Sequence, residues 1–434
     1  MSTSSEKGAL GQSQAGRSGG VEQLDKPLDS GCGLGKSSKP PARATAVEPR
    51  QYVVGTNSFD YPQHRNFLSL PLQNCDFRLT CSKDLFKLVR NRYATRILRR
   101  YPHALSALTN LYYDFNTSGC DLLHFFNHVS IGRTPWVTTF ETIVPYWGWH
   151  SEWLTRTALR HVACKQCRKL IAISNRAHQI QTQFLLLRYP EYHDDISAKI
   201  CVIHPAQVPL MSDYNEKRLA EGDIMFTMVG NMFFLKGGME VLRVFDHLLK
   251  RNYPIRLNIV SAMQNAKDPK RETVAEEIAA ARTIINRHPD RIRHWGAIPN
   301  DQVLALLRET HVGLMPTHYD TYGYFVLEAQ ASACPVITTD AVALPEINGD
   351  EVGWVINVDK DAYGTPLYTT AAEYRRLHES IEASLIQTIQ EIVNHPEMIQ
   401  RKGLNALERI RRDHDPRKTA EKLEAIYDSV TRGE

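Results

Sequence analysis

From residue 52 onward, short runs of apolar residues alternate with longer segments that have helical periodicity. Four apolar runs occupy the first half of the chain, at 122–126, 136–139, 170–174 and 200–203. Six more occupy the second half, at 224–229, 256–260, 292–295, 312–315, 336–338 and 354–356. This alternation predicts parallel sheets that are covered by helices on their faces.

The alternating pattern occurs twice, and a looser stretch separates the two series. A chain of 434 residues is also too long for one small core. We therefore expect an α/β protein with two Rossmann-like, doubly wound domains, 51–208 and 209–415, facing a cleft. The helical periodicity continues to the C-terminus, and we expect 416–434 to form a helix that packs back on the N-terminal domain.

The first 50 residues have a different composition from the rest. They contain no Phe, Trp or Tyr and are rich in Gly, Ser and Lys. Such a segment cannot bury enough apolar area to offset its ordering entropy, so residues 1–50 are predicted to be a disordered tail. The tail contains Gly35-Lys36-Ser37, but Ser30 stands where a phosphate loop requires its first glycine. We expect no nucleotide site there.

Overall composition narrows the class of protein. The formal net charge of +4 is too small to indicate a nucleic-acid partner. No run of about 18 apolar residues lacks charge, and the N-terminus has no apolar signal core. The eight cysteines show no framework spacing, and the one CxxC, Cys164 to Cys167, lacks a second pair. These features predict a cytoplasmic protein with reduced thiols.

The first strand of the second series leads into a turn with glycines and then into a predicted helix. The turn contains Gly230, Asn231, Lys236 and Gly237. Free N–H groups and the helix dipole attract anions at such a position, and Lys236 adds a full positive charge. The pattern predicts a phosphate site, although a lysine near a helix start is usually solvated.

A second motif follows the apolar run at 312–315. Asp320 lies in the next loop, Gly323 is expected to begin a helix, and Glu328 falls in the first two turns of that helix. Both carboxylates can then face one ligand, and exposed amides at the same helix end can hold its charge. The alternative is that Asp320 caps the helix and Glu328 is a surface charge.

Further motif residues follow in a fixed order along the second half of the chain. They are Gly296, Leu314, Met315, Pro316, Ala329, Ala333, Cys334, Pro335, Val336, Ile337, Leu344, Pro345, Glu346 and Gly353. Together with the two loops above, this order resembles the retaining glycosyltransferases of glycosyltransferase family 4, the group 1 transferases with the GT-B fold. The resemblance is specific across 224–356 and looser elsewhere.

The resemblance implies that the C-terminal domain binds a nucleoside-diphosphate sugar, linked to UDP or GDP, and that the N-terminal domain binds the acceptor. Lys236 would contact the donor diphosphate, Glu328 the ribose and Asp320 the hydroxyls of the transferred sugar. The remaining implied donor-binding residues are Gly230, Asn231, Gly237, Ala297, Ile298, Tyr322, Gly323, Tyr324 and Phe325.

The implied reaction is transfer, with retention, to a hydroxyl of a glycan, a lipid-linked acceptor or a small molecule. Lys236 would stabilise the negative charge that grows on the leaving diphosphate. The resemblance implies no cofactor and no metal. Two D-x-D triplets, 359–361 and 413–415, are of a kind that arises easily by chance.

Three positions depart from the family pattern. Asp320 stands where the family usually has Glu, and Asn231 stands where it usually has Arg. Glu141 lies near the end of the 136–139 strand, where the family often has His, and it is a candidate catalytic residue. These departures leave two alternatives open: a degenerate GT-B domain that binds without turnover, and a GT-B epimerase or phosphorylase.

The N-terminal domain offers candidate acceptor loops at 55–65 and 140–150. An aromatic cluster of Tyr146, Trp147 and Trp149 in the second loop can stack on a sugar or pack the cleft. Residues 83–100 carry seven Lys or Arg against one Asp, with apolar residues between them. They can form a basic amphipathic helix at an anionic membrane surface, or a solvated face of the acceptor domain.

Overall fold

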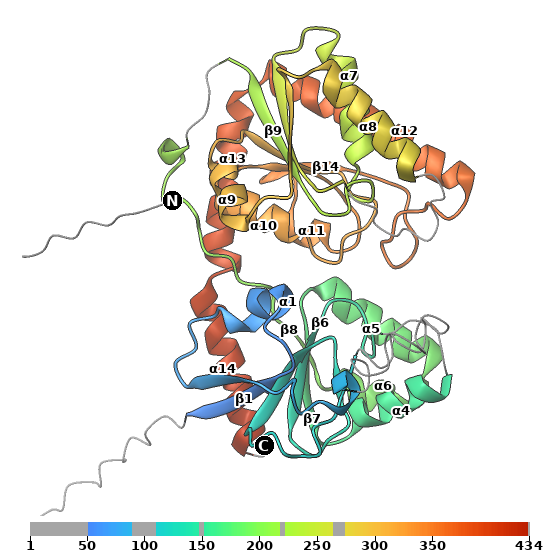
Figure 1. Ribbon diagram of the computed structural model, residues 1–434, viewed down its shortest axis with the longest axis vertical. Coiled ribbons are helices and arrows are strands. Elements are labelled where there is room, and N and C mark those ends of the chain that lie inside the picture. The colour runs from blue at the N-terminus through green and yellow to red at the C-terminus, as the bar shows by residue number, and fades with distance from the viewer. Residues whose placement is uncertain (1–50, 89–109, 147–151, 218–221, 264–273, 433–434) are drawn as a thin grey trace, which may run out of the picture. The chain divides into compact units, whose positions relative to one another are not determined.

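The computed structural model describes residues 51–88, 110–146, 152–217, 222–263 and 274–432 (Figure 1). The expected disordered tail, most of the 83–100 segment, Trp147 and Trp149 lie outside the described residues. None of the helices within the described ranges combines the length and the apolar character that crossing a membrane would need.

The N-terminal domain is built on a six-stranded parallel sheet in the order β2-β1-β4-β6-β7-β8. The strands are β1 (Tyr52–Thr56), β2 (Cys75–Leu79), β4 (Leu122–Phe126), β6 (Trp136–Phe140), β7 (Cys167–Ala172) and β8 (Ile200–Val202). Sequence periodicity did not identify β1 or β2. A glycine interrupts β1, and β2 is a half-exposed edge strand with Asp76 and Arg78 in its middle.

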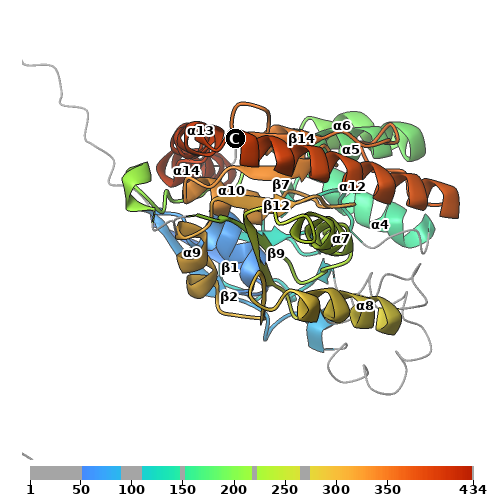
Figure 2. The ribbon, with the colours of Figure 1, turned by 90° about the horizontal axis from the view of Figure 1, so that it is seen from above.

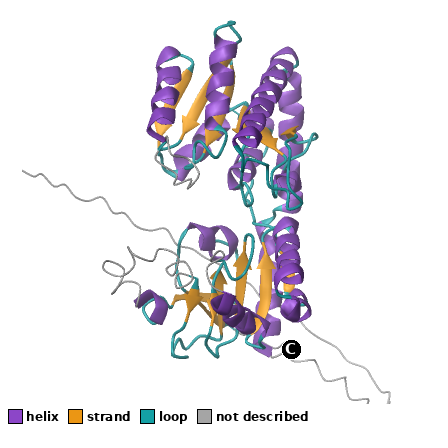
Figure 3. Ribbon diagram, turned by 90° about the vertical axis from the view of Figure 1, so that its right-hand side faces the viewer, coloured by secondary structure: helices purple, strands orange, loops and turns teal. Residues whose placement is uncertain are grey.

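Helices and short elements complete this domain (Figure 3). They are α1 (Tyr61–Gln63), the π-helical turn η1 (His64–Leu68), α4 (Glu152–Ala163), α5 (Asn175–Arg188), the 3₁₀ turn η2 (Pro190–Tyr192) and α6 (His193–Ser197), with a two-stranded sheet of β3 (Leu111–Tyr112) and β5 (Val129–Ser130). Ser174 begins α5 as an N-cap, since its hydroxyl accepts a hydrogen bond from the Ala177 amide at 2.9 Å.

The second sheet is also parallel and six-stranded, in the order β11-β10-β9-β12-β13-β14. The strands are β9 (Ile224–Val229), β10 (Ile255–Val260), β11 (Ile292–Gly296), β12 (Val312–Met315), β13 (Val336–Thr339) and β14 (Gly353–Ile356). All six were expected from the apolar runs. The prediction of two doubly wound, parallel-sheet domains is therefore confirmed.

Helices cover both faces of the second sheet (Figures 1 and 2). One apolar core lies under α7 (Gly238–Leu249), α8 (Val274–Arg287) and α12 (Ala371–Asn394). A second core lies under α9 (Asn300–Arg308), α10 (Tyr324–Ala331), α11 (Leu344–Ile347) and α13 (Glu397–Asp413). A 3₁₀ turn, η3 (Tyr214–Glu216), packs beside α13.

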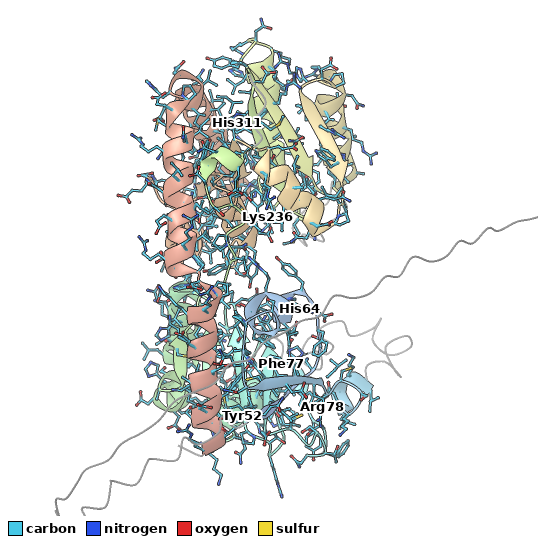
Figure 4. The ribbon with its side chains drawn as sticks, turned by 90° about the vertical axis from the view of Figure 1, so that its left-hand side faces the viewer. Tyr52, His64, Phe77, Arg78, Lys236 and His311 are labelled. Atoms are coloured by element: carbon cyan, nitrogen blue, oxygen red, sulfur yellow. The ribbon has the colours of Figure 1, made fainter. Side chains whose placement is uncertain are left out.

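The last helix, α14 (Pro416–Arg432), packs against the first sheet (Figure 4). Tyr427 is fully buried among residues of β1 and β4. Its hydroxyl lies 2.6 Å from Nδ1 of His124, and burial lowers the pKa of that histidine to about 3. The polypeptide thus returns to the N-terminal domain after completing the C-terminal one.

The order of the second sheet locates a natural binding position. From β9 the chain proceeds outward through β10 and β11, and then returns to place β12 on the other side of β9. The loops after β9 and β12 therefore diverge, and in open parallel sheets ligands bind where adjacent loops separate in this way. Lys236 follows β9 and His311 precedes β12, so they lie at opposite ends of this sheet (Figure 4).

Candidate active site

The loops after β9 and β12 are bonded to each other. The Leu235 carbonyl accepts hydrogen bonds from the amide of His318 at 2.9 Å and from the hydroxyl of Thr317 at 3.1 Å. Gly237 has a φ of 81°, and a Cβ at this position would overlap the Pro316 carbonyl oxygen. The close approach of the two loops therefore requires glycine at position 237.

This approach brings Lys236 and Asp320 together. The Lys236 ammonium forms an ion pair with Oδ2 of Asp320 and donates a hydrogen bond to the Tyr319 carbonyl at 3.3 Å. The side chains are only 13% and 15% exposed. Oδ1 of Asp320 accepts a hydrogen bond from the Tyr322 amide at 3.0 Å. The N-cap of α10 is Gly323, so Asp320 does not cap that helix.

The two helix N-termini at the site are not equivalent. Before α7, the amides of Lys236, Gly237 and Gly238 already donate to carbonyls of residues 232–234. At this loop an anion would therefore contact the Lys236 side chain rather than those three amides. Helix α10 begins after Gly323, which has a φ of 97° and provides no side-chain cap. Its first amides point out of the helix end, where they can bind an anion.

Glu328 is a buried carboxylate and not a surface charge. It lies in the second turn of α10 and is 6% exposed. Burial raises the pKa of its carboxyl, while the charge of Arg65 and a hydrogen bond from the Asn300 side chain lower it. A carboxylate removed from water in this way binds hydroxyl groups strongly, because its alternative is an unsatisfied charge.

These groups line one cavity of about 430 Å³. We call it the donor cavity, after the ligand that the sequence predicts for it. The predicted donor-binding residues that line it are Gly230, Asn231, Lys236, Ala297, Ile298, Asp320, Tyr324, Phe325 and Glu328. Three other predicted donor-binding residues do not line the cavity. Gly237 and Gly323 shape the loops, and Tyr322 is fully buried, with its hydroxyl 3.3 Å from Nδ1 of His204.

Glu141 follows β6 in the N-terminal domain and reaches the same loop. Its carboxylate accepts hydrogen bonds from the Asn127 amide group at 3.1 Å and from the Thr321 hydroxyl at 3.0 Å. Burial raises the pKa of Glu141, and the charge of Asp320 acts in the same direction. This carboxylate thus stands beside the residue that follows Asp320.

Residues 212–363 match the family model described as glycosyl transferases group 1. This group 1 region contains Lys236, Asp320 and Glu328, and it excludes Glu141 and the whole N-terminal sheet.

Curated relatives match the chain over part of its length. A glycogen synthase of Mycobacterium tuberculosis is 25% identical over 142 residues, which are 33% of this chain and 30% of that protein. A D-inositol 3-phosphate glycosyltransferase of Segniliparus rotundus is 24% identical over 197 residues, 43% of this chain and 42% of the relative. The chain thus matches less than half the length of these relatives.

Solved structures extend the likeness to both domains. A glycosyltransferase from Rickettsia africae superposes with a TM-score of 0.55 at 13% identity, covering 89% of this chain and all of that one. The Anabaena protein HepE, in complex with UDP and glucose, gives 0.53 at 12% identity, covering 88% and 100%. At these identities the likeness concerns the fold, which is GT-B.

Residues that sequence analysis missed complete the donor cavity outside the group 1 region. Tyr61 of α1 lines the cavity. Arg65 lies over the Tyr324 ring, 5.2 Å from its centroid, and bonds Gln207 at 2.6 Å. Their segment was expected to form an acceptor loop. Nothing in its sequence indicates contact with α10, because that contact depends on how the two domains fold against each other.

A larger cavity, of about 1290 Å³, lies beside Glu141. The loops after β1, β4 and β6 contribute to it, as do Ile180, Phe184 and Leu187 on one face of α5. Tyr146 of the predicted acceptor loop also lines it. The strand ends of the N-terminal domain therefore supply most of the wall of this second cavity, and Tyr319, Tyr363 and Thr365 of the C-terminal domain complete it.

The D-x-D triplets have partners within the protein. Oδ1 of Asp361 accepts hydrogen bonds from the amides of Tyr363 and Thr365, and Asp413 pairs with Arg412. Among the described residues, ligand atoms suited to a metal gather instead at Glu240, His318 and His378, away from the donor cavity lining.

Proposed function

We propose that this chain is a retaining glycosyltransferase of family 4 that moves a sugar from a nucleoside-diphosphate sugar to an acceptor hydroxyl. The observation that carries the proposal is the single cavity in which Lys236, Asp320 and Glu328 converge. The cation of Lys236 suits the diphosphate, the carboxylate of Asp320 suits the sugar, and the more deeply buried carboxylate of Glu328 suits the ribose of one ligand.

When the donor binds, the Lys236 ammonium and the Asp320 carboxylate each change partners. The diphosphate takes the place of Asp320 as the partner of the ammonium. The released carboxylate then accepts hydrogen bonds from sugar hydroxyls, while the amides at the start of α10 contact the phosphate. Glu328 holds the ribose hydroxyls. Asn231 supplies a neutral amide where the family pattern has a cation.

In the reaction, the bond between the anomeric carbon and the phosphate oxygen breaks as a bond to the acceptor oxygen forms on the same face. The acceptor proton passes to an oxygen of the leaving diphosphate. Lys236 stabilises the charge that develops there, so no metal is required at the diphosphate. Glu141 lines the larger cavity and orients the Asp320 loop through Thr321.

The acceptor binds in the larger cavity of the N-terminal domain. Its lining combines the apolar face of α5 with carboxylates, among them Asp60 and Glu141, which suits a hydroxylated acceptor with an apolar part. UDP-linked sugars are the first donors to test, because the solved HepE structure of the same fold holds UDP and glucose. A peripheral contact with the cytoplasmic face of a membrane through 83–100 stays a prediction.

A donor screen tests the proposal. The full chain is incubated with UDP- and GDP-linked hexoses, and its unfolding temperature is measured, because a ligand of the folded state raises stability by mass action. Release of nucleoside diphosphate and the anomeric configuration of the product are then determined with the donor that binds. We expect one class of nucleotide sugar to stabilise the protein and the product to retain configuration.

Each other result has a definite meaning. Stabilisation without release of nucleoside diphosphate, with any acceptor extract, favours the degenerate binding domain. Inverted configuration contradicts the retaining mechanism. If no nucleotide sugar changes the unfolding temperature, the donor assignment itself is wrong.

A further inference from the structure

A buried cluster of Glu240, His318 and His378 lies in the C-terminal domain and plays no part in the proposed transfer. Glu240 stands in the first turn of α7, His318 in the loop after β12, and His378 on α12. Their side chains are 0%, 1% and 12% exposed. Oε1 of Glu240 lies 2.5 Å from Nε2 of His318 and pairs with Nδ1 of His378.

The cluster leaves polar atoms unsatisfied. Oε2 of Glu240 is buried and has no hydrogen-bond partner among the described residues. Among the described residues, Nδ1 and Nε2 of His378 are also buried and have no hydrogen-bond partner. Nδ1 lies at ion-pair distance from Glu240 but does not have hydrogen-bond geometry. A carboxylate withdrawn from water in this way needs a compensating positive charge.

The donor set suits a transition-metal ion. One ligand atom from each of the three residues lies within 4.8 Å of the other two. Two imidazoles and a carboxylate are ligands that zinc binds at about 2.0–2.2 Å, usually with a further position for water. Magnesium prefers oxygen ligands, so nitrogen donors favour an ion of the zinc type.

The cluster also borders a cavity. A cavity of about 410 Å³ opens beside it and is lined by Glu240 and His378. Glutamates outnumber arginines four to two along its wall. The resulting negative potential attracts a cation toward Glu240 and His378.

We propose that Glu240, His318 and His378 bind one divalent ion of the zinc class. The ion joins α7, the loop that carries Asp320 and helix α12. His318 is two residues from Asp320, and Glu240 is four residues from Lys236, so the ion fixes both donor loops from behind. It takes no part in the chemistry, and the inference does not rest on the proposed transferase activity.

The test is metal analysis of the full chain. The protein is stripped with a chelator, equilibrated with Zn²⁺ and desalted, and metal is counted by plasma mass spectrometry. We expect one zinc per chain and a rise in unfolding temperature on the order of 5 °C. His378→Asn should lose the zinc, whereas His378→Cys should keep it, because a thiolate remains a zinc ligand. If His378 only packed against its neighbours, the two variants would not differ in bound zinc.

Controls separate this site from adventitious binding. His395→Asn, which changes an exposed histidine near the end of α12, should keep one zinc per chain. Cobalt in place of zinc should give visible d–d bands without thiolate charge transfer, since the site contains no cysteine. Wild-type protein without stoichiometric zinc overturns the proposal, as does full zinc in His378→Asn or a thiolate band in the cobalt form.

Discussion

Replacement of Lys236 by methionine keeps most of the side-chain volume but removes the charge that, in the proposed function, binds the donor diphosphate. Lys236 is 13% exposed, so its interaction with a developing oxyanion is only weakly screened. Loss of one such donor costs about 3–4 kcal/mol in the transition state, or roughly a 10²–10³-fold fall in kcat. Methionine at this position should therefore leave transfer barely measurable.

The same substitution acts on the ligand-free protein. Among the described residues, Asp320 then keeps only the Tyr322 amide as a partner, so a nearly buried carboxylate loses its cation. Leaving such a group without its partner costs about 1–3 kcal/mol of stability. Adding Asp320→Asn removes the unpaired charge and should restore much of that stability. It should not restore transfer, because the cation is still missing.

The assay measures release of nucleoside diphosphate at saturating donor, together with chemical denaturation of each variant. Lys250→Ala is the matched control, because Lys250 is a 52% exposed lysine at the other end of α7 and should leave kcat unchanged. A near-normal kcat in Lys236→Met would refute the phosphate assignment. Recovery of activity in the double variant would show that the loss came from folding.

Three further predictions concern the walls of the donor cavity. Gly237→Ala should lower stability by roughly 1–3 kcal/mol and weaken donor binding in calorimetry, because the new Cβ overlaps Pro316. Gly349→Ala is the control and should change neither quantity, because its Cβ meets no atom within 4 Å. Glu328→Gln should abolish nucleotide binding yet raise the unfolding temperature of the ligand-free protein at neutral pH; lower stability would contradict this. Because the pKa of Glu328 is raised, its unfavourable contribution to the free energy of unfolding is absent at acidic pH and grows as pH rises through the folded pKa. In Glu328→Gln, stability should therefore change less with pH over that range. Arg65→Ala should move the pKa of Glu328 further upward. When pH is lowered, donor affinity should then be lost at a higher pH than in the wild type. An unchanged pH profile of donor affinity would show that Arg65 does not act on Glu328.

The sequence alone determined the architecture and placed the proposed donor-binding residues on it. Apolar runs of strand length, separated by helical periodicity, are local properties of the chain, so all six strands of the second sheet could be predicted. Lys236, Asp320 and Glu328 could be proposed because each follows a predicted strand in an order that resembles a known family. Where the local signal was weak, as in the glycine-interrupted β1 and the polar edge strand β2, the prediction failed.

The tertiary structure decided which of these residues meet. Lys236 and Asp320 are 84 positions apart, and their ion pair depends on β9 and β12 being neighbours in the sheet. Arg65 reaches Tyr324, and Glu240 reaches His378, only through packing between elements that are distant in sequence. Such contacts produce no periodic pattern of apolar residues in the sequence. Their free energy is gained only when separate elements fold against each other.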